Sequence, residues 1–80
     1  HMNKNYNFND ISNVMHECFN NDIKIYPVVY DRLHFKIEID FAGRKKLGKE
    51  KYNWKTQQKE LQKKINELYY EIHKRIQKRK

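Results

Sequence analysis

Apolar residues recur along this chain first with a helical period, then with a strand period, and then with a helical period again. The first helical stripe has apolar side chains three and four positions apart: Ile11, Val14, Met15, Cys18 and Phe19. Asn7 is suited to cap this helix, with Tyr6 and Ile11 as a hydrophobic staple around the cap. Asn20-Asn21-Asp22 is suited to end it, because Asn tolerates left-handed backbone. We therefore predict a first helix over Asn7–Asn20.

The middle of the chain predicts three short strands in a meander. The clearest alternation places Phe35, Ile37, Ile39 and Phe41 on one face and Lys36, Glu38 and Asp40 on the other. Before it, Ile23–Tyr30 predicts a strand at a sheet edge, because Pro27 lacks a backbone donor. After it, Ala42-Gly43 turns the chain, and Arg44–Tyr52 predicts a third strand in which Gly48 marks a bulge or bend. Short connections favour the antiparallel order 1-2-3.

A long amphipathic helix is predicted over Trp54–Lys78, with Asn53 as its cap. Its apolar stripe consists of Leu61, Ile65, Leu68, Tyr69, Ile72 and Ile76. Such a helix is about 37 Å long, and a strand over 33–41 is about 30 Å, so its last turns are expected to overhang the sheet. An overhang would leave Ile72 and Ile76 short of partners, so a homodimer is one expected assembly.

These elements predict a single α+β domain over residues 1–80: an N-terminal helix, a three-stranded antiparallel meander and a long helix packed on the sheet. His1-Met2 resembles an expression scar. Cys18 is the only cysteine, so it cannot form an internal disulfide; this fits a core residue and a reducing cytoplasm. No apolar run is long enough to cross a membrane.

Charge is divided unevenly between the two halves of the chain. Residues 44–80 carry 14 Lys/Arg and 4 Asp/Glu, a net +10, whereas residues 1–43 carry 4 and 6, a net −2. A cationic side of this kind predicts a polyanion or an acidic protein surface as partner.

Basic residues are densest after the second turn. The candidate contacts to a nucleic acid or an acidic partner are Arg44, Lys45, Lys46, Lys49, Lys51 and Lys55, with a second cluster at Lys74 and Arg75. Tyr52 and Trp54 are interleaved with the first set, as in sites where rings rest on sugar or base. The alternative interpretation is a solvated hairpin that serves solubility. Trp54 itself is better interpreted as a core residue or a plug at the corner before the helix.

The polar face of the central strand points to a different kind of partner. Glu38 and Asp40 would repel phosphates, and the neighbouring edge strand presents Tyr26, Val28 and Tyr30 beside them. An aromatic strip with mixed charge is typical of a protein-binding edge. Alternatively, the first helix covers this strip.

No catalytic, metal or cofactor site is predicted. His16 and Cys18 lie two positions apart on a helix and cannot share a metal ion, and the other histidines are isolated. The two glycines, Gly43 and Gly48, lie in no phosphate-binding motif. We therefore expect a binding protein and not an enzyme.

The strand Phe35-Lys36-Ile37-Glu38-Ile39-Asp40, the basic turn Gly43-Arg44-Lys45-Lys46, Trp54 and the helix after it resemble the arm-type, AP2-like N-terminal DNA-binding domains of tyrosine integrases. The resemblance covers Leu33 to about Ile76 and implies that the sheet enters the major groove. It would assign DNA contacts to Arg44, Lys45, Lys46 and Lys49. The chain departs from the pattern in having a helix before the sheet and acidic residues on the sheet face.

Two functions are therefore expected. The first is a DNA-binding accessory or regulatory protein of a phage or other mobile element, with DNA rather than RNA as partner. The second is a small inhibitor, of the anti-CRISPR sort, that binds an acidic surface of a nucleic-acid-processing enzyme.

Overall fold

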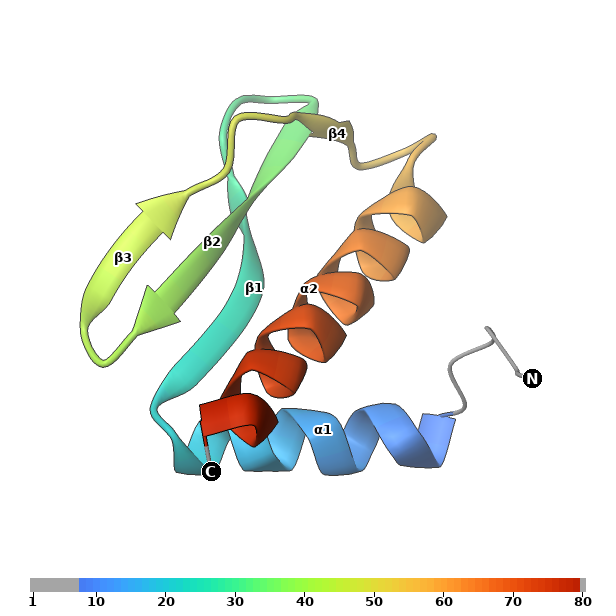
Figure 1. Ribbon diagram of the computed structural model, residues 1–80. Helices are drawn as coiled ribbons and strands as arrows, with labels where there is room; N and C mark the ends of the chain where they lie inside the picture. Colours follow the sequence, from blue (N-terminus) through green and yellow to red (C-terminus); the bar gives the residue numbers. More distant parts are fainter. Residues whose placement is uncertain (1–7, 80) are drawn as a thin grey trace.

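The computed structural model describes residues 8–79. The chain forms α1 (Phe8–Asn20), β1 (Ile23–Val29), β2 (His34–Phe41), β3 (Arg44–Leu47), β4 (Tyr52–Asn53) and α2 (Gln58–Arg79), as shown in Figure 1. The sheet is antiparallel in the order β1-β2-β3, and β4 pairs with the beginning of β2. The predicted α+β fold is confirmed. Among the described residues, no helix has both the length and the apolar character needed to span a bilayer.

The hairpin between β2 and β3 turns through two residues with left-handed backbone. Ala42 has φ 54° and Gly43 has φ 90°, the signs of a type I′ turn. The Asp40 carboxylate accepts a hydrogen bond from the Gly43 N–H at 2.8 Å, and the Asp22 carbonyl accepts one from the Ala42 N–H at 2.8 Å. The predicted turn is confirmed, and the second bond ties the hairpin to the turn between α1 and β1.

The predicted third strand is broken into two strands at Gly48. The Gly48 N–H donates to the Ile37 carbonyl at 2.8 Å, and a Cβ at this position would lie 3.2 Å from the same oxygen. The chain leaves the sheet there and returns at Tyr52, opposite Phe35. The bend expected at Gly48 is therefore present, but a continuous strand over Arg44–Tyr52 is wrong.

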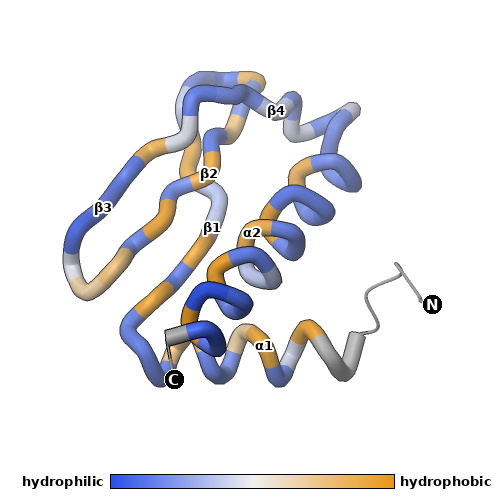
Figure 2. The backbone as a smooth tube through the Cα atoms, in the orientation of Figure 1, coloured by the Kyte–Doolittle hydropathy of each residue, from blue (hydrophilic) through white to orange (hydrophobic). Residues whose placement is uncertain are grey.

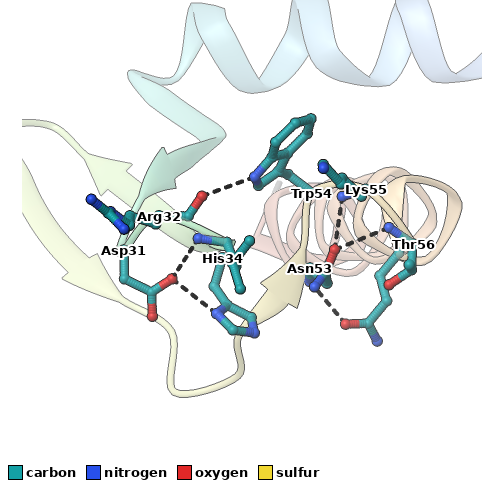
Figure 3. Close-up of polar contacts among 9 residues, drawn as sticks. Asp31, Arg32, His34, Asn53, Trp54, Lys55 and Thr56 are labelled. Atoms are coloured by element: carbon teal, nitrogen blue, oxygen red, sulfur yellow. Dashed lines mark hydrogen bonds and ion pairs between the residues drawn. The ribbon is translucent and has the colours of Figure 1, made fainter.

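The last helix begins four residues later than predicted. Asn53 Oδ1 accepts hydrogen bonds from the Lys55 and Thr56 N–H groups at 2.9 and 3.1 Å, so it caps a separate turn (Figure 3). The Gln57 side chain bonds the Asn53 N–H at 2.8 Å, and α2 starts only after that contact, at Gln58. At the other end of the chain, the predicted cap at Asn7 lies outside the described residues.

Both helices pack on one face of the sheet. The buried apolar side chains come from α1, α2 and three strands: Ile11, Val14, Cys18, Ile23, Ile25, Ile37, Tyr52, Leu61, Ile65 and Tyr69. Figure 2 shows the apolar positions of α2 facing the strands. Phe41 was expected in this core, but it is 49% exposed because neither α1 nor α2 covers the C-terminal end of β2. The opposite, outer face of the sheet is not covered by α1, so that alternative is wrong.

The last turns of α2 lie against α1 and do not overhang the body. Gln77 Nε2 donates to the Glu17 carboxylate at 2.9 Å, and His73 bonds the same oxygen. The Phe19 ring meets Tyr69 edge-on, with centroids 6.1 Å apart. The overhang expected from helix length is therefore wrong, because α2 crosses the sheet and continues over α1.

Candidate functional site

Six cations follow one edge of the sheet from the β2–β3 hairpin to the beginning of α2. This basic edge consists of Arg44, Lys45, Lys46, Lys49, Lys51 and Lys55, all of which are exposed. Within the described residues, none of the six has a carboxylate oxygen within 4.0 Å. Figure 2 shows hydrophilic positions in β3 and again in the segment before β4, separated by an apolar position at the end of β3. These charges are free to meet an external anion.

Strand alternation divides the basic edge between two faces. Lys45 pairs with Asp40 and therefore points to the outer face. Arg44 and Lys46 pair with Phe41 and Ile39 and point to the face that carries the helices. The residues that the integrase resemblance assigned to DNA thus share an edge but not a face.

Two partly exposed aromatic rings lie near the far end of the basic edge. The Lys36 and Lys51 ammonium groups lie 4.2 and 5.3 Å from the centre of the Tyr30 ring, and Lys55 lies 5.3 Å from that of Trp54. These distances are within the range of cation–π attraction. The rings are 50% and 39% exposed, so each could rest against a sugar or base.

Trp54 joins the corner before α2 to the loop between β1 and β2. Its Nε1 donates to the Arg32 carbonyl at 3.0 Å (Figure 3). In the same loop, the Asp31 carboxylate accepts a hydrogen bond from the Leu33 N–H and contacts His34 at 2.9 Å. Those two contacts lower the pKa of Asp31 and keep it anionic. Trp54 therefore closes the corner before α2, which was one of the two predicted alternatives. At 39% exposure it is not a core residue, so the other alternative is wrong.

Tyr52 cannot serve as a stacking ring. Its side chain is 8% exposed, and its hydroxyl donates to the Glu50 carboxylate at 3.0 Å. Burial, followed by this hydrogen bond, raises the pKa of Tyr52 to about 12. Of the two aromatic residues interleaved with the basic segment, only Trp54 is accessible.

The two acidic side chains of the outer face lie beside a hydrogen-bond donor and two lysines. The Tyr26 hydroxyl donates to Glu38 at 2.7 Å, and that bond is the main reason why the pKa of Tyr26 rises to about 12. Asp40 stands in register between Lys24 and Lys45. The face is thus a mixture of charge and apolar surface and not an acidic patch.

The predicted protein-binding residues Tyr26, Val28 and Tyr30 are accessible to a partner from the outer face but not by strand addition. The Tyr69 hydroxyl accepts a hydrogen bond from the Ile25 N–H and donates to the Ile25 carbonyl, both at 2.9 Å. Two residues further along the same edge, Pro27 has no N–H to offer. An added strand would have to displace Tyr69, so the structure disfavours strand addition at β1.

A groove runs between α2 and the helix-facing side of β2 and β3. One pocket of about 490 Å³ is lined by Asn21, Ile23, Ile39, Phe41, Lys46, Ile72, Arg75 and Ile76. A second pocket of about 220 Å³ is lined by Ile37, Ile39, Gly48, Lys49, Glu50, Tyr52, Lys64 and Leu68. Ile39 lines both pockets, so they are adjacent. We call them together the helix–sheet groove.

The second predicted basic cluster separates at this groove. Arg75 lines it, whereas the adjacent Lys74 is exposed and does not. The groove was not predicted from the sequence, although the apolar row of β2 extends to Phe41 and was its signal. In residues 8–79, no group of three acidic, His or Cys side chains is placed to hold a metal ion.

Comparison of the chain with known protein families, with curated proteins and with solved structures finds no match.

Proposed function

We propose that this protein binds duplex DNA through the phosphate backbone, as a cytoplasmic accessory or regulatory protein of a phage or other mobile element. It would need no cofactor and have no catalytic activity of its own. The basic edge carries this proposal, because its six cations are exposed and free of internal ion pairs. Lys and Arg in this state neutralise phosphates and release condensed counterions.

The edge is a better DNA contact than the outer face. Phosphates approaching the outer face would meet Glu38 and Asp40. Residues 44–55, which form the basic edge, contain one acidic residue, Glu50. Tyr30 and Trp54 add ring surface near one end, where lysines already lie over them. A duplex along this edge would be held by charge and shape, so little sequence preference is expected.

Fluorescence anisotropy with a random-sequence duplex of about 20 base pairs, between about 50 and 200 mM salt, tests the proposal. If all six cations contact phosphate, log K should fall with log salt at a slope of about −5. The triple variant Arg44→Ser, Lys45→Ser, Lys51→Ser should reduce that slope by about 2.7. It should fold normally, because the three side chains are exposed.

The matched control removes the same charge elsewhere. Lys63, Lys74 and Lys78 are exposed on α2, beyond its first turn, which is the part that follows the basic edge. Changing these three to Ser should leave the salt slope nearly unchanged. Equal losses in the two triple variants would assign the effect to net charge, and no binding by the parent at about 50 mM salt would reject DNA binding.

A second candidate function is a small phage-type inhibitor that docks on a nucleic-acid-processing enzyme. The outer face, which neither α1 nor α2 covers, favours it. Tyr26 and Val28 lie there along β1, and the 44% exposed Leu47 lies on β3, with Glu38 in register between Tyr26 and Leu47. If this function is right and DNA binding is wrong, random duplex should not bind, and Val28→Asp should abolish binding to the enzyme without unfolding the protein.

A further inference from the structure

The helix–sheet groove is open because of where α2 crosses the sheet. Its buried stripe Leu61, Ile65 and Tyr69 packs with the core beside β1 and β4. The neighbouring stripe of α2, from Lys64 to Ile76, lines pockets that separate it from β2 and β3. The groove is thus lined by apolar residues that continue the hydrophobic core.

The sheet and α2 both contribute apolar side chains to the floor of the groove. Ile39 and Phe41 contribute from β2, and Leu68, Ile72 and Ile76 contribute from α2. The last three are spaced by four residues and span about 12 Å, which is a little over two helical turns. A partner helix with apolar residues at i, i+4 and i+7 covers a similar length, the spacing used when a helix lies in a groove.

The rim of the groove is cationic on both sides. Lys46 and Lys49 stand on the sheet side, and Lys64 and Arg75 stand on the helix side. The one carboxylate among the lining residues, Glu50, already accepts a hydrogen bond from Tyr52. Charge complementarity therefore calls for an occupant with acidic flanks.

A second copy of this chain fits the groove poorly. In a two-fold dimer the same patch would meet itself, so the cationic rims would face each other. An apolar floor also offers no hydrogen bond or charge to a DNA duplex, whose surface is sugar and phosphate. We propose that the helix–sheet groove binds an amphipathic helix of a partner protein, with apolar residues facing the floor and Glu or Asp flanking them.

Adjacent basic residues on β3 and on α2 point in different directions. They therefore provide matched variants that test peptide binding separately from DNA binding. Lys46 and Arg75 line the groove, and their neighbours Lys45 and Lys74 do not. The double variants Lys46→Ser, Arg75→Ser and Lys45→Ser, Lys74→Ser have the same net charge and change only exposed residues. Any difference between them reports the rim of the groove and not long-range attraction.

The probe is a synthetic amphipathic peptide of about 14 residues, or about four helical turns, with Leu on one face and Glu on the flanks. Its twin carries Lys in place of each Glu. Binding is measured by fluorescence anisotropy, together with NMR of the isoleucine methyl groups. The acidic peptide should bind at least about tenfold more tightly than the basic twin. It should shift the methyl signals of Ile39, Ile72 and Ile76 but not that of Ile11.

The groove variant should lose about tenfold in affinity for the acidic peptide, and the control variant less than about twofold. No binding of the acidic peptide up to about 1 mM would overturn the proposal, as would equal losses in the two variants. Methyl signals of the groove that move with protein concentration alone would assign it to a second copy. The same signals moved by duplex DNA, and not by the peptide, would assign it to nucleic acid.

Discussion

The change Tyr69→Phe isolates the contribution of one hydroxyl group to the fold. Tyr69 is 2% exposed, and its hydroxyl is the partner of both the N–H and the carbonyl of Ile25 on the outer edge of β1. Burial raises the pKa of this hydroxyl, so it stays protonated and can donate and accept at once. Phe fills nearly the same volume, so the change removes two hydrogen bonds and little packing.

The expected loss of unfolding free energy depends on whether the N–H and carbonyl of Ile25 stay buried without a partner. Each hydrogen bond contributes about 0.5–1.5 kcal/mol net, and a buried backbone group without a partner costs about 1–3 kcal/mol. Water can reach part of the opened edge, so we expect a loss of about 2–4 kcal/mol. That is a large share of the stability of an 80-residue domain, which is about 4–12 kcal/mol at typical values per residue.

Urea unfolding followed by far-ultraviolet circular dichroism measures this loss, provided that the slope with urea stays the same. Tyr52→Phe is the control, because its hydroxyl bonds only the exposed Glu50. The control should lose less than about 1 kcal/mol. The amide of Ile25 should also exchange faster with solvent in Tyr69→Phe. Equal stabilities of the two variants would show that the hydroxyl is no better a partner for β1 than water is.

Three further changes test the core, the hairpin and the titrating groups. Ile37→Ala, at 5% exposure, should cost about 2–5 kcal/mol, and Val29→Ala, at 73% exposure, should cost less than about 0.5 kcal/mol; equal costs would mean that the core face is misplaced. Ala42→Asn should raise the urea midpoint by the equivalent of about 0.5–1 kcal/mol, because Asn tolerates φ 54° better than Ala; an unchanged midpoint would contradict strain there. Burial raises the pKa of Cys18 to about 11 and that of Tyr52 to about 12, so the unfolded chain releases these protons first and stability should fall as pH rises above about 9. Urea midpoints at pH 8 and 10.5 measure this, and a flat profile would contradict it.

Local pattern was sufficient to predict most of the fold. The alternation of apolar and polar residues in 35–41 predicted β2. Pro27 correctly predicted that β1 is an edge strand, because the outer side of an edge strand needs no N–H donor. The glycines were interpreted correctly at both the turn and the bend. Each of these depends on a residue and its near neighbours, which a sequence displays directly.

The errors arose where a contact distant in sequence competes with local preference. Asn53 is a good helix cap, yet Gln57 and the Trp54 contact to Arg32 hold it in a separate turn. The length of α2 suggested an overhang, yet Glu17 of α1 meets its last turns. Propensity cannot weigh such contacts, because they exist only once the chain is folded.

The candidate site shows the same division. The sequence predicted the six cations of the basic edge as a set, because a run of charge is visible without any structure. The sequence did not distinguish Lys46 from Lys45, or Arg75 from Lys74. Only the folded structure shows that Lys46 and Arg75 face the groove and that their neighbours do not.

The sequence by itself determined the helical and strand segments, the edge position of β1 and the cationic character of the second half of the chain. These properties follow from side-chain periodicity and from composition. Tertiary structure alone decided that α2 lies over β1 and not over the middle of the sheet. That offset results from packing summed over both helices and all strands, and it leaves Phe41 half exposed, opens the groove and brings the Tyr69 hydroxyl to the backbone of Ile25.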